Sequence, residues 1–188
     1  MVAHESPGGP VRIQGQRLLL RPFTGPEIDR EWQEMVSADP MAIATRPDEA
    51  TFRARLARSG HLRGGWLDLA VEADGEWIGR IQTFVPPART LPPGSYEIGI
   101  GLRAPSRGRG YGREALALLT GWLFSQAGAR LVQSETDPAN VAMRRVFERC
   151  GWQPAGTLTE FGREWAAYRL TREEWQRQRD GTPDHPAR

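Results

Sequence analysis

Residues 96–102, YEIGIGL, run directly into residues 103–113, RAPSRGRGYGR, and this junction decides the fold. The first part alternates at period two, which predicts a β-strand with four apolar side chains on one face: Tyr96, Ile98, Ile100 and Leu102. The other face carries Glu97 and two glycines, a pattern that marks a close approach by a ligand or by another backbone. We take this face to be the ligand side.

The loop at residues 107–112, RGRGYG, predicts an anion-binding site. Its glycines remove side chains that would keep a ligand from the backbone, just where the next helix leaves its first N–H groups unpaired. Those amides, the helix dipole and the arginines suit a diphosphate. The alternative is a flexible turn with solvated arginines. The spacing fits neither the dinucleotide-binding fingerprint nor the P-loop motif, which disfavours dehydrogenases and P-loop NTPases.

Hydrophobic periodicity on either side of this junction predicts the remaining elements. Helices are expected over residues 24–38, 48–58, 113 to about 126 and about 138–149, and strands over 18–23, 66–72, 77–84, 96–102, 130–136, 152–159 and 165–170. Asp74 and Gly75 suit a tight hairpin turn between two of the strands. The order predicts an α/β (α+β) fold, with a mixed, mostly antiparallel central sheet of about seven strands and helices on both faces.

Length and composition fit one domain. A chain of 188 residues, 39% of them hydrophobic, can bury a core without metals or disulfides. Residues 1–12 and 181–188 are rich in Gly, Pro and polar residues and are expected to be disordered tails around a domain at 13–180. No long apolar run or signal peptide is visible, and Cys150 stands alone, so we expect a cytoplasmic protein.

Composition also excludes several classes of function. All 25 basic residues are arginine, so neither a Schiff-base lysine nor a P-loop lysine is available. The three histidines lie far apart, and we predict no metal site. A formal net charge of only +2 gives no reason to expect nucleic acid binding, and without an apolar span we expect no membrane partner.

The glycine-rich loop matches a known family signature. Arg107, Gly110 and Gly112 fit the pattern [RQ]-x-x-G-x-[GA] of the GNAT (Gcn5-related N-acetyltransferase) superfamily, which the chain therefore resembles. The flanking runs YEIGIGL, REALALLTGWLF and TDPANVAMRRVFERCGW are similar to the branch that contains the ribosomal-protein N-terminal acetyltransferases. The resemblance covers about residues 18–175.

This resemblance implies acetyl-CoA, or another acyl-CoA, as cosubstrate. The backbone of Ile100, Gly101 and Leu102 would pair with the pantetheine arm, and Asn140 would bond the pantetheine or cap its helix. The pyrophosphate would be held by seven consecutive residues: Arg107, Gly108, Arg109, Gly110, Tyr111, Gly112 and Arg113. Where many relatives carry a tyrosine proposed as general acid, this chain has Phe147, which has no proton to donate.

Acyl transfer to an amine requires a neutral amine, donors for the developing oxyanion and departure of the thiolate. Glu97 is the candidate base, acting directly or through a water chain; its alternative role is to orient substrate or to pair with an arginine. Glu135, Asp137 and Glu160 are reserve candidates. Water or Tyr111 would protonate the thiolate, or it would leave unprotonated, because a thiol pKa of about 8.5 makes it a tolerable leaving group.

The sequence thus predicts an N-acetyltransferase that moves an acetyl or other acyl group from coenzyme A to a primary amine in a ternary complex. The acceptor is a small molecule or a protein N-terminus. One alternative is a non-catalytic acyl-CoA-binding sensor or scaffold of the same fold; another is an arginine-rich nucleic-acid binder with steeply salt-dependent affinity. The acyl chain length and a homodimer are left open.

Overall fold

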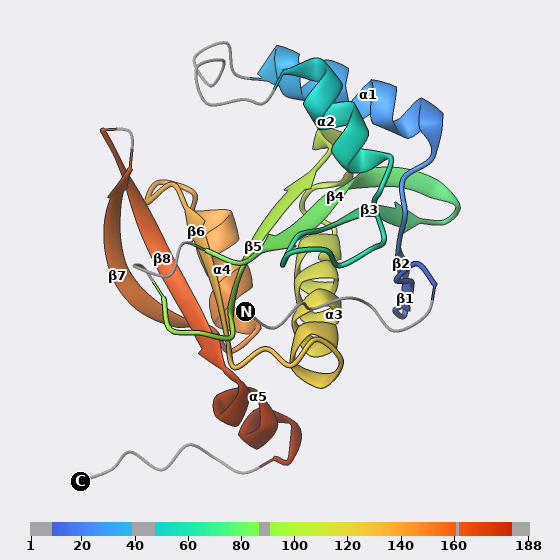
Figure 1. The fold of residues 1–188 in the computed structure, drawn as a ribbon. Coiled ribbons are helices and arrows are strands. Elements are labelled where there is room, and N and C mark those ends of the chain that lie inside the picture. Colours follow the sequence, from blue (N-terminus) through green and yellow to red (C-terminus); the bar gives the residue numbers. More distant parts are fainter. Residues whose placement is uncertain (1–8, 39–47, 87–90, 161, 182–188) are drawn as a thin grey trace, which may run out of the picture.

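An eight-stranded sheet lies at the centre of the computed structural model, which describes residues 9–38, 48–86, 91–160 and 162–181 (Figure 1). Its strands are β1 (Ile13–Gln14), β2 (Leu18–Arg21), β3 (Leu67–Ala73), β4 (Glu76–Phe84), β5 (Ser95–Leu102), β6 (Leu131–Thr136), β7 (Gln153–Glu160) and β8 (Arg163–Thr171). They are ordered β1-β2-β3-β4-β5-β6-β8-β7, and β5–β6 is the parallel pair among the described strands. The predicted mixed, mostly antiparallel sheet is confirmed, with the short β1 as an additional edge strand.

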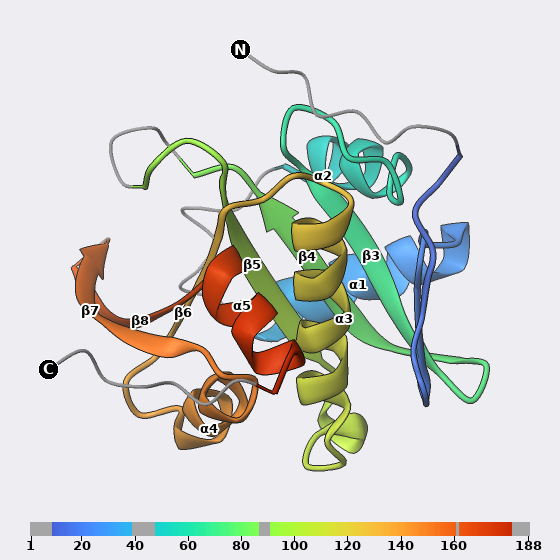
Figure 2. The same ribbon diagram turned by 90° about the horizontal axis from the view of Figure 1, so that it is seen from below.

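Helices cover both faces of this sheet, as predicted. They are α1 (Gly25–Ala38), α2 (Glu49–Leu56), α3 (Tyr111–Ser125), α4 (Val141–Arg149) and α5 (Arg172–Arg179). Figure 2 shows α3 across β4 and β5, with α1 behind the sheet. The sequence did not predict α5, which begins at a capping box in which Thr171 and Glu174 bond each other's backbone N–H.

Two apolar clusters hold these layers together. On one face, Leu116, Leu119 and Leu123 of α3 are fully buried against a sheet that contributes Tyr96 and Ile98 of β5. On the opposite face, Phe52 and Leu56 of α2 are fully buried in a second cluster with Ala70 and Trp77. The sheet therefore lies between two packed layers, and β5 is anchored to the layer that contains α3.

The predicted hairpin between β3 and β4 is confirmed at its turn. Asp74 and Gly75 have φ angles of +51° and +78°, which is the paired left-handed conformation that a two-residue hairpin loop requires. Further along, β5 and β6 pair over only three residues, 95–97 against 131–133, although β5 is eight residues long. The two strands therefore diverge, and half of β5 has a free edge.

The predicted tails fall partly outside the described residues, at 1–8 and 182–188. Val11, which the sequence assigned to the N-terminal tail, is only 7% exposed, belongs to the main core, and donates its N–H to the Gly60 carbonyl at 2.6 Å. The packed part of the chain thus begins before the predicted boundary at residue 13. Val11 is an apolar residue in a polar stretch, and its side chain packs in the main core. Among the described helices, none is long and apolar enough to cross a membrane.

Candidate functional site

The free edge of β5 presents backbone groups in a fixed alternation. On its paired side β5 follows β4 to its end, and the Arg103 N–H donates to the Ile78 carbonyl at 2.9 Å. Because hydrogen-bonded pairs alternate in an antiparallel ladder, Ile100 and Leu102 direct their backbone groups to the free edge. We expected Gly101 to do so as well; its backbone instead faces Arg80 of β4, although Gly101 still lines the cleft described below.

Two side-chain contacts mark the ends of this free edge. Ser134 of β6 donates its hydroxyl to the Ile98 carbonyl at 2.7 Å, and Arg107 donates its Nε–H to the Leu102 carbonyl at 2.8 Å. Between them, the N–H and C=O of Ile100 and the N–H of Leu102 point to the side from which β6 has diverged. An extended ligand that offers amide groups can pair with them as a strand would.

The loop between β5 and α3 has a backbone that glycine adopts with little strain. Gly108 and Gly110 have φ angles of +74° and +81°, and Gly110 is the N-cap of α3 with no side-chain capping hydrogen bond. The first N–H groups of α3 therefore have no capping side chain at Gly110, and they lie at the positive end of the helix dipole. An anion bound at this point would accept hydrogen bonds from these N–H groups.

Arg17, in the turn between β1 and β2, holds the far side of this loop. Its Nη1 donates to the Arg109 carbonyl at 3.0 Å, its Nε bonds Glu114 at 3.0 Å, and its guanidinium lies 4.9 Å from the centre of the Tyr111 ring. Glu114 in turn accepts the backbone N–H groups of Arg17 and Leu18. These contacts join the edge of the sheet to the first turn of α3 and fix the loop between them.

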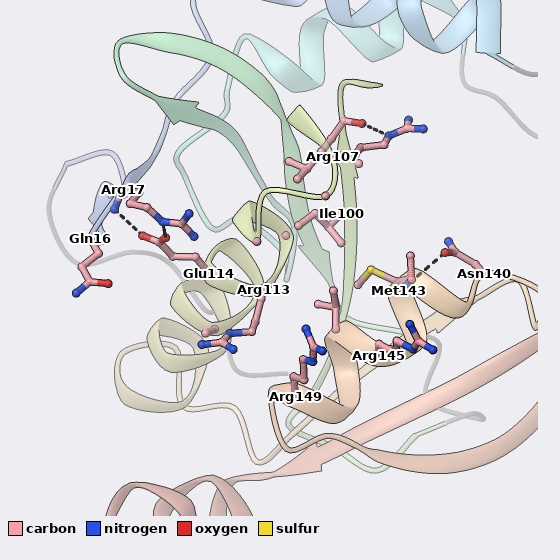
Figure 3. Close-up of a pocket in the computed structure, with 18 residues that line it drawn as sticks. Gln16, Arg17, Ile100, Arg107, Arg113, Glu114, Asn140, Met143, Arg145 and Arg149 are labelled. Carbon is pink, nitrogen blue, oxygen red and sulfur yellow. Dashed lines mark hydrogen bonds and ion pairs between the residues drawn. The ribbon is translucent and has the colours of Figure 1, made fainter. Parts of the chain in front are cut away.

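These elements enclose a cleft of about 1120 Å³ between the edge of β5, the start of α3 and α4 (Figure 3). Small residues open it to a ligand: Gly101, Gly108, Gly110, Gly112, Ala117 and Ala142. Its charged side chains are one glutamate, Glu114, and five arginines: Arg17, Arg107, Arg113, Arg145 and Arg149. Since Glu114 is already paired with Arg17, the cleft suits a long ligand with several negative charges.

Asn140 closes the cleft at the start of α4. It is the N-cap of that helix, and its Oδ1 accepts the N–H of Met143 at 3.1 Å. Its amide nitrogen has no partner among the described residues and remains a donor at the cleft. The two roles expected for Asn140, capping and ligand binding, therefore use different atoms of one side chain.

Phe147 faces away from the cleft into the core. Its ring is fully buried and packs on those of Tyr168, at 4.9 Å between centroids, and Trp152, at 5.4 Å. Tyr168 is itself buried, and its hydroxyl accepts a hydrogen bond from Arg144 at 3.1 Å. The position at which many relatives carry a tyrosine thus has a packing role in this chain.

Glu97 lies on the opposite face of β5, the face that packs toward α1 and α2. Its register partner is Phe84 of β4, and partners in register share a face of the sheet. Arg80 lies on the same face of β4 and pairs with Glu31 of α1, so this face is the one toward α1. Burial raises the pKa of Glu97 to about 7, and the nearby carboxylates of Glu135 and Glu160 add to the shift. A carboxyl group with this pKa can accept a proton near neutral pH.

The neighbours of Glu97 form a polar row along β6 and β8. Glu135 accepts a hydrogen bond from Gln133 at 2.9 Å, and Gln133 accepts one from Arg169 at 2.8 Å. Burial, followed by repulsion from Glu160, raises the pKa of Glu135 above its usual range. Asp137, the third reserve candidate, is instead engaged in the turn before α4, where it accepts the N–H of Ala139.

A family model for the acetyltransferase (GNAT) domain matches residues 17–153, which is most of the chain. The chain belongs to this GNAT acetyltransferase family. Its solved relatives include an acetyltransferase of the GNAT family from Bacillus anthracis, with 20% identity, a TM-score of 0.68, and coverage of 87% of this chain and 99% of the other. The site described above thus occurs in an acetyltransferase fold.

Two further GNAT structures are similar in fold. The aminoglycoside acetyltransferase AAC(6')-Ib, in complex with coenzyme A and kanamycin, is 22% identical, with a TM-score of 0.69 over 86% of this chain and 99% of the other. Mycobacterium smegmatis RimJ, in complex with CoA-disulfide, is 19% identical, with a TM-score of 0.66 over 97% and 98%. At these identities the likeness shows a shared fold.

The GNAT cleft brings most of the expected donor-site residues together. Ile100, Leu102 and Asn140 line it, as do five residues of the predicted loop: Arg107, Gly108, Gly110, Gly112 and Arg113. Arg109 and Tyr111 do not line it; they are the loop residues that Arg17 contacts. Glu97 also lies outside it, on the other face of β5. Within the described residues, no group of three or more His, Cys, Asp or Glu side chains could hold a metal ion.

Sequence reasoning missed several residues that line the cleft. They come from the β1–β2 turn (Gln16, Arg17) and from the helices (Glu114, Ala117, Ala142, Met143, Arg145, Val146, Arg149). Arg145 and Arg149 carried a usable signal, because they are four residues apart in the helix that Asn140 begins and so share one face of it.

Proposed function

We propose that this chain transfers an acetyl group from acetyl-CoA to a primary amine of a small molecule or a protein N-terminus, by direct attack in a ternary complex. The observation that carries the proposal is the cleft, in which the free edge of β5, the uncapped start of α3 and a set of arginines follow one another. Coenzyme A has matching parts: an amide-containing arm, a diphosphate and a nucleotide.

The relatives support the choice of donor and of acceptor class. AAC(6')-Ib has been solved with ribostamycin and coenzyme A, as well as with kanamycin, and these aminoglycosides carry amines. RimJ has been solved with a coenzyme A disulfide. The same fold thus serves coenzyme A and amine acceptors in related chains, and the cleft of this chain has donors for both the arm and the phosphates.

In this proposal the two substrates bind on opposite faces of β5. The donor lies on the α3 and α4 side, with its thioester at the opening where β6 diverges, and the acceptor amine arrives from the side of α1 and α2. Glu97 stands on that acceptor side and takes a proton from the amine, directly or through water, so that the nitrogen attacks as a free base. The backbone N–H of Ile100 or Leu102 is placed to stabilise the oxyanion.

Departure of the thiolate requires no side chain in this proposal. The buried ring of Phe147 cannot donate a proton, and Tyr111 lies beneath Arg17 outside the cleft. A thiol pKa of about 8.5 lets the thiolate leave unprotonated or take a proton from water. Replacing Phe147 with another apolar residue would therefore act through packing and not through proton transfer.

The test combines binding with turnover. Calorimetric titration of acetyl-CoA is expected to give saturable binding, and thiol release is expected when acetyl-CoA is mixed with an acceptor from a panel containing kanamycin, spermidine and a peptide with a free N-terminus. Release that requires both substrates supports acetyl transfer. Binding without release by any acceptor would support the non-catalytic acyl-CoA-binding alternative, and absence of binding would reject both.

A further inference from the structure

Two arginines of α4 line the cleft without an anionic partner. The side chains of Arg145 and Arg149 form no hydrogen bond or ion pair with a described residue, whereas that of the adjacent Arg144 bonds both the Tyr168 hydroxyl and the Pro138 carbonyl. Four residues apart on a helix, they lie on one face, with about 6 Å between their Cβ atoms. That face is the one that lines the cleft, together with Ala142 and Val146.

Their position follows from how α4 packs on α3. The Cys150 thiol lies 3.6 Å from the Arg113 carbonyl, which places the C-terminal end of α4 beside the first turn of α3. Asn140, at the N-terminal end of α4, is therefore the end of the helix that lies away from this contact. The cleft therefore extends from the free edge of β5 to an end surrounded by Arg113 of α3 and Arg149 of α4, and Figure 3 shows Arg149 between the two helices.

The diphosphate does not need these arginines. The loop amides, the dipole of α3 and Arg107 lie together at the start of α3, which is sufficient for a diphosphate. A ligand that lies along β5 and places its diphosphate at the start of α3 would bring the group after the diphosphate to the C-terminal end of α4. In coenzyme A that part is the ribose, which carries a phosphate monoester with about two negative charges at neutral pH.

We infer that Arg145 and Arg149, with Arg113, form a separate subsite for the 3′-phosphate of the coenzyme A nucleotide, so that the protein selects coenzyme A over 3′-dephospho-coenzyme A. This inference rests on the proposed function, because it requires coenzyme A in the cleft. Guanidinium groups suit the task, since they stay protonated and donate paired hydrogen bonds to phosphate oxygens. Selection would then depend on α4 rather than on the glycine-rich loop.

Calorimetric titrations of coenzyme A and of 3′-dephospho-coenzyme A test the inference on the full chain and on the double variant Arg145→Gln/Arg149→Gln. The unaltered protein is expected to bind coenzyme A about tenfold or more tightly than the dephospho form. In the double variant, affinity for coenzyme A should fall to that for the dephospho form, whose own affinity should be unchanged. Such a loss, confined to one ligand, is the signature of contact with the missing phosphate.

The double variant Arg12→Gln/Arg177→Gln is the charge-matched control, because both arginines are exposed and neither lines the cleft. It should leave both affinities unchanged. Equal affinity of the unaltered protein for the two ligands, or an equal loss for both in the double variant, would overturn the 3′-phosphate subsite while leaving coenzyme A binding intact. Failure of both ligands to bind the unaltered protein would instead overturn the proposed function, and with it this inference. Thermal unfolding of each variant shows that the fold is retained.

Discussion

The Ser134 hydroxyl donates a hydrogen bond of 2.7 Å to the Ile98 carbonyl, one residue beyond the last register pair of β5 and β6. Both residues are buried, Ser134 with 3% and Ile98 with 1% of its surface exposed. A side chain thus continues the contact between the strands after the backbone ladder has ended. It fixes the point at which β5 acquires its free edge, and so the start of the cleft.

Ser134→Ala is expected to destabilise the protein by about 1–3 kcal/mol, because it removes the hydroxyl donor from a buried carbonyl. The free energy of unfolding in urea measures this. Ser125→Ala is the matched control: the Ser125 hydroxyl donates to the Gly121 carbonyl at the same distance, 2.7 Å, but on an exposed turn of α3. It should change stability by less than about 0.5 kcal/mol. Equal effects of the two substitutions would contradict a special role for Ser134.

Arg17 and Glu114 provide a second prediction, on the ordering of the loop. Arg17→Gln removes the bond to the Arg109 carbonyl and the cation–π contact with Tyr111. Arg17 is half exposed, so stability should fall by less than about 1 kcal/mol. Coenzyme A should nevertheless bind about three- to tenfold more weakly, because the loop amides are no longer held in place. Calorimetry measures the affinity.

Glu114→Gln separates ordering of the loop from simple attraction of the ligand. This variant makes the cleft more positive, so a purely electrostatic role for the Arg17–Glu114 pair predicts tighter binding of coenzyme A. We predict weaker binding, because glutamine keeps an oxygen for the two backbone N–H groups that Glu114 Oε1 accepts but places an NH2 group where Oε2 accepts Arg17 Nε, so Arg17 is no longer held against the loop. Glu76→Gln, at an exposed glutamate outside the cleft whose side chain has no hydrogen bond or ion pair among the described residues, is the control for net charge and should change nothing.

The sequence predicted the strand and loop of the candidate donor site because short-range patterns determine both. Alternation placed Tyr96 and Ile98 on the buried face, and Gly108 and Gly110 of the loop adopt left-handed φ angles. The divergence of β5 from β6 could not be predicted from the sequence, since it depends on pairing between distant segments and on a single hydroxyl, that of Ser134. The backbone direction of Gly101 likewise follows from its register with Arg80, which no local pattern contains.

The errors on the helices have more local causes. The start of α4 was predicted at residue 138, but Asp137 first forms a turn with Ala139, and the helix begins after Asn140. The sequence contains the capping pattern from Thr171 to Glu174, which is a local signal for the start of α5. Arg145 and Arg149 line the cleft, but the sequence does not single them out because charged helix positions are most often solvated.

Gly112 provides the cleanest test of close approach by a ligand. Unlike Gly108 and Gly110, it does not have a left-handed φ angle, and an added Cβ would meet only Leu102 Cδ1, at an ordinary 3.8 Å. Gly112→Ala should therefore raise stability, by about 0.5–1 kcal/mol, as alanine does within a helix. Gly112→Val, whose branches occupy the cleft, should weaken coenzyme A binding by at least about tenfold. Calorimetry and thermal unfolding measure the two effects.

Gly121→Ala is the control for this series, because Gly121 lies in the same helix but outside the cleft, with Trp175 at 3.7 Å from an added Cβ. It should stabilise the helix to a similar degree and leave coenzyme A binding unchanged. If Gly112→Val binds coenzyme A as tightly as the unaltered protein does, the ligand does not approach the start of α3, and the loop does not hold the diphosphate.

The pKa of Glu97 leads to two linked predictions, and the first concerns the pH dependence of activity. With a pKa of about 7, Glu97 is mostly protonated below neutral pH and cannot act as a base there, so kcat/KM should rise with pH and approach a plateau above about 7. Glu97→Gln should lower kcat/KM by about 10²- to 10⁴-fold. The ratio of the two rates for one acceptor, measured from pH 5 to 9, cancels the titration of the acceptor amine, which is common to both. A ratio independent of pH would remove Glu97 from proton transfer.

Ionisation of Glu97 should also affect stability, but in the opposite direction: activity rises with pH, whereas stability falls. The pKa of Glu97 is raised from 4.5 in the unfolded chain to about 7, so the folded protein binds the proton more tightly between these values, and the free energy of unfolding falls as pH rises through them. Glu97→Gln removes this fall and should gain stability relative to the unaltered protein at pH 8 but not at pH 4. Glu135→Gln, which removes a neighbouring negative charge, should lower the pKa of Glu97 and shift the activity profile to lower pH. If that profile does not move while Glu97→Gln still abolishes its pH dependence, the charge of Glu135 does not contribute to the raised pKa, and burial and Glu160 are its causes.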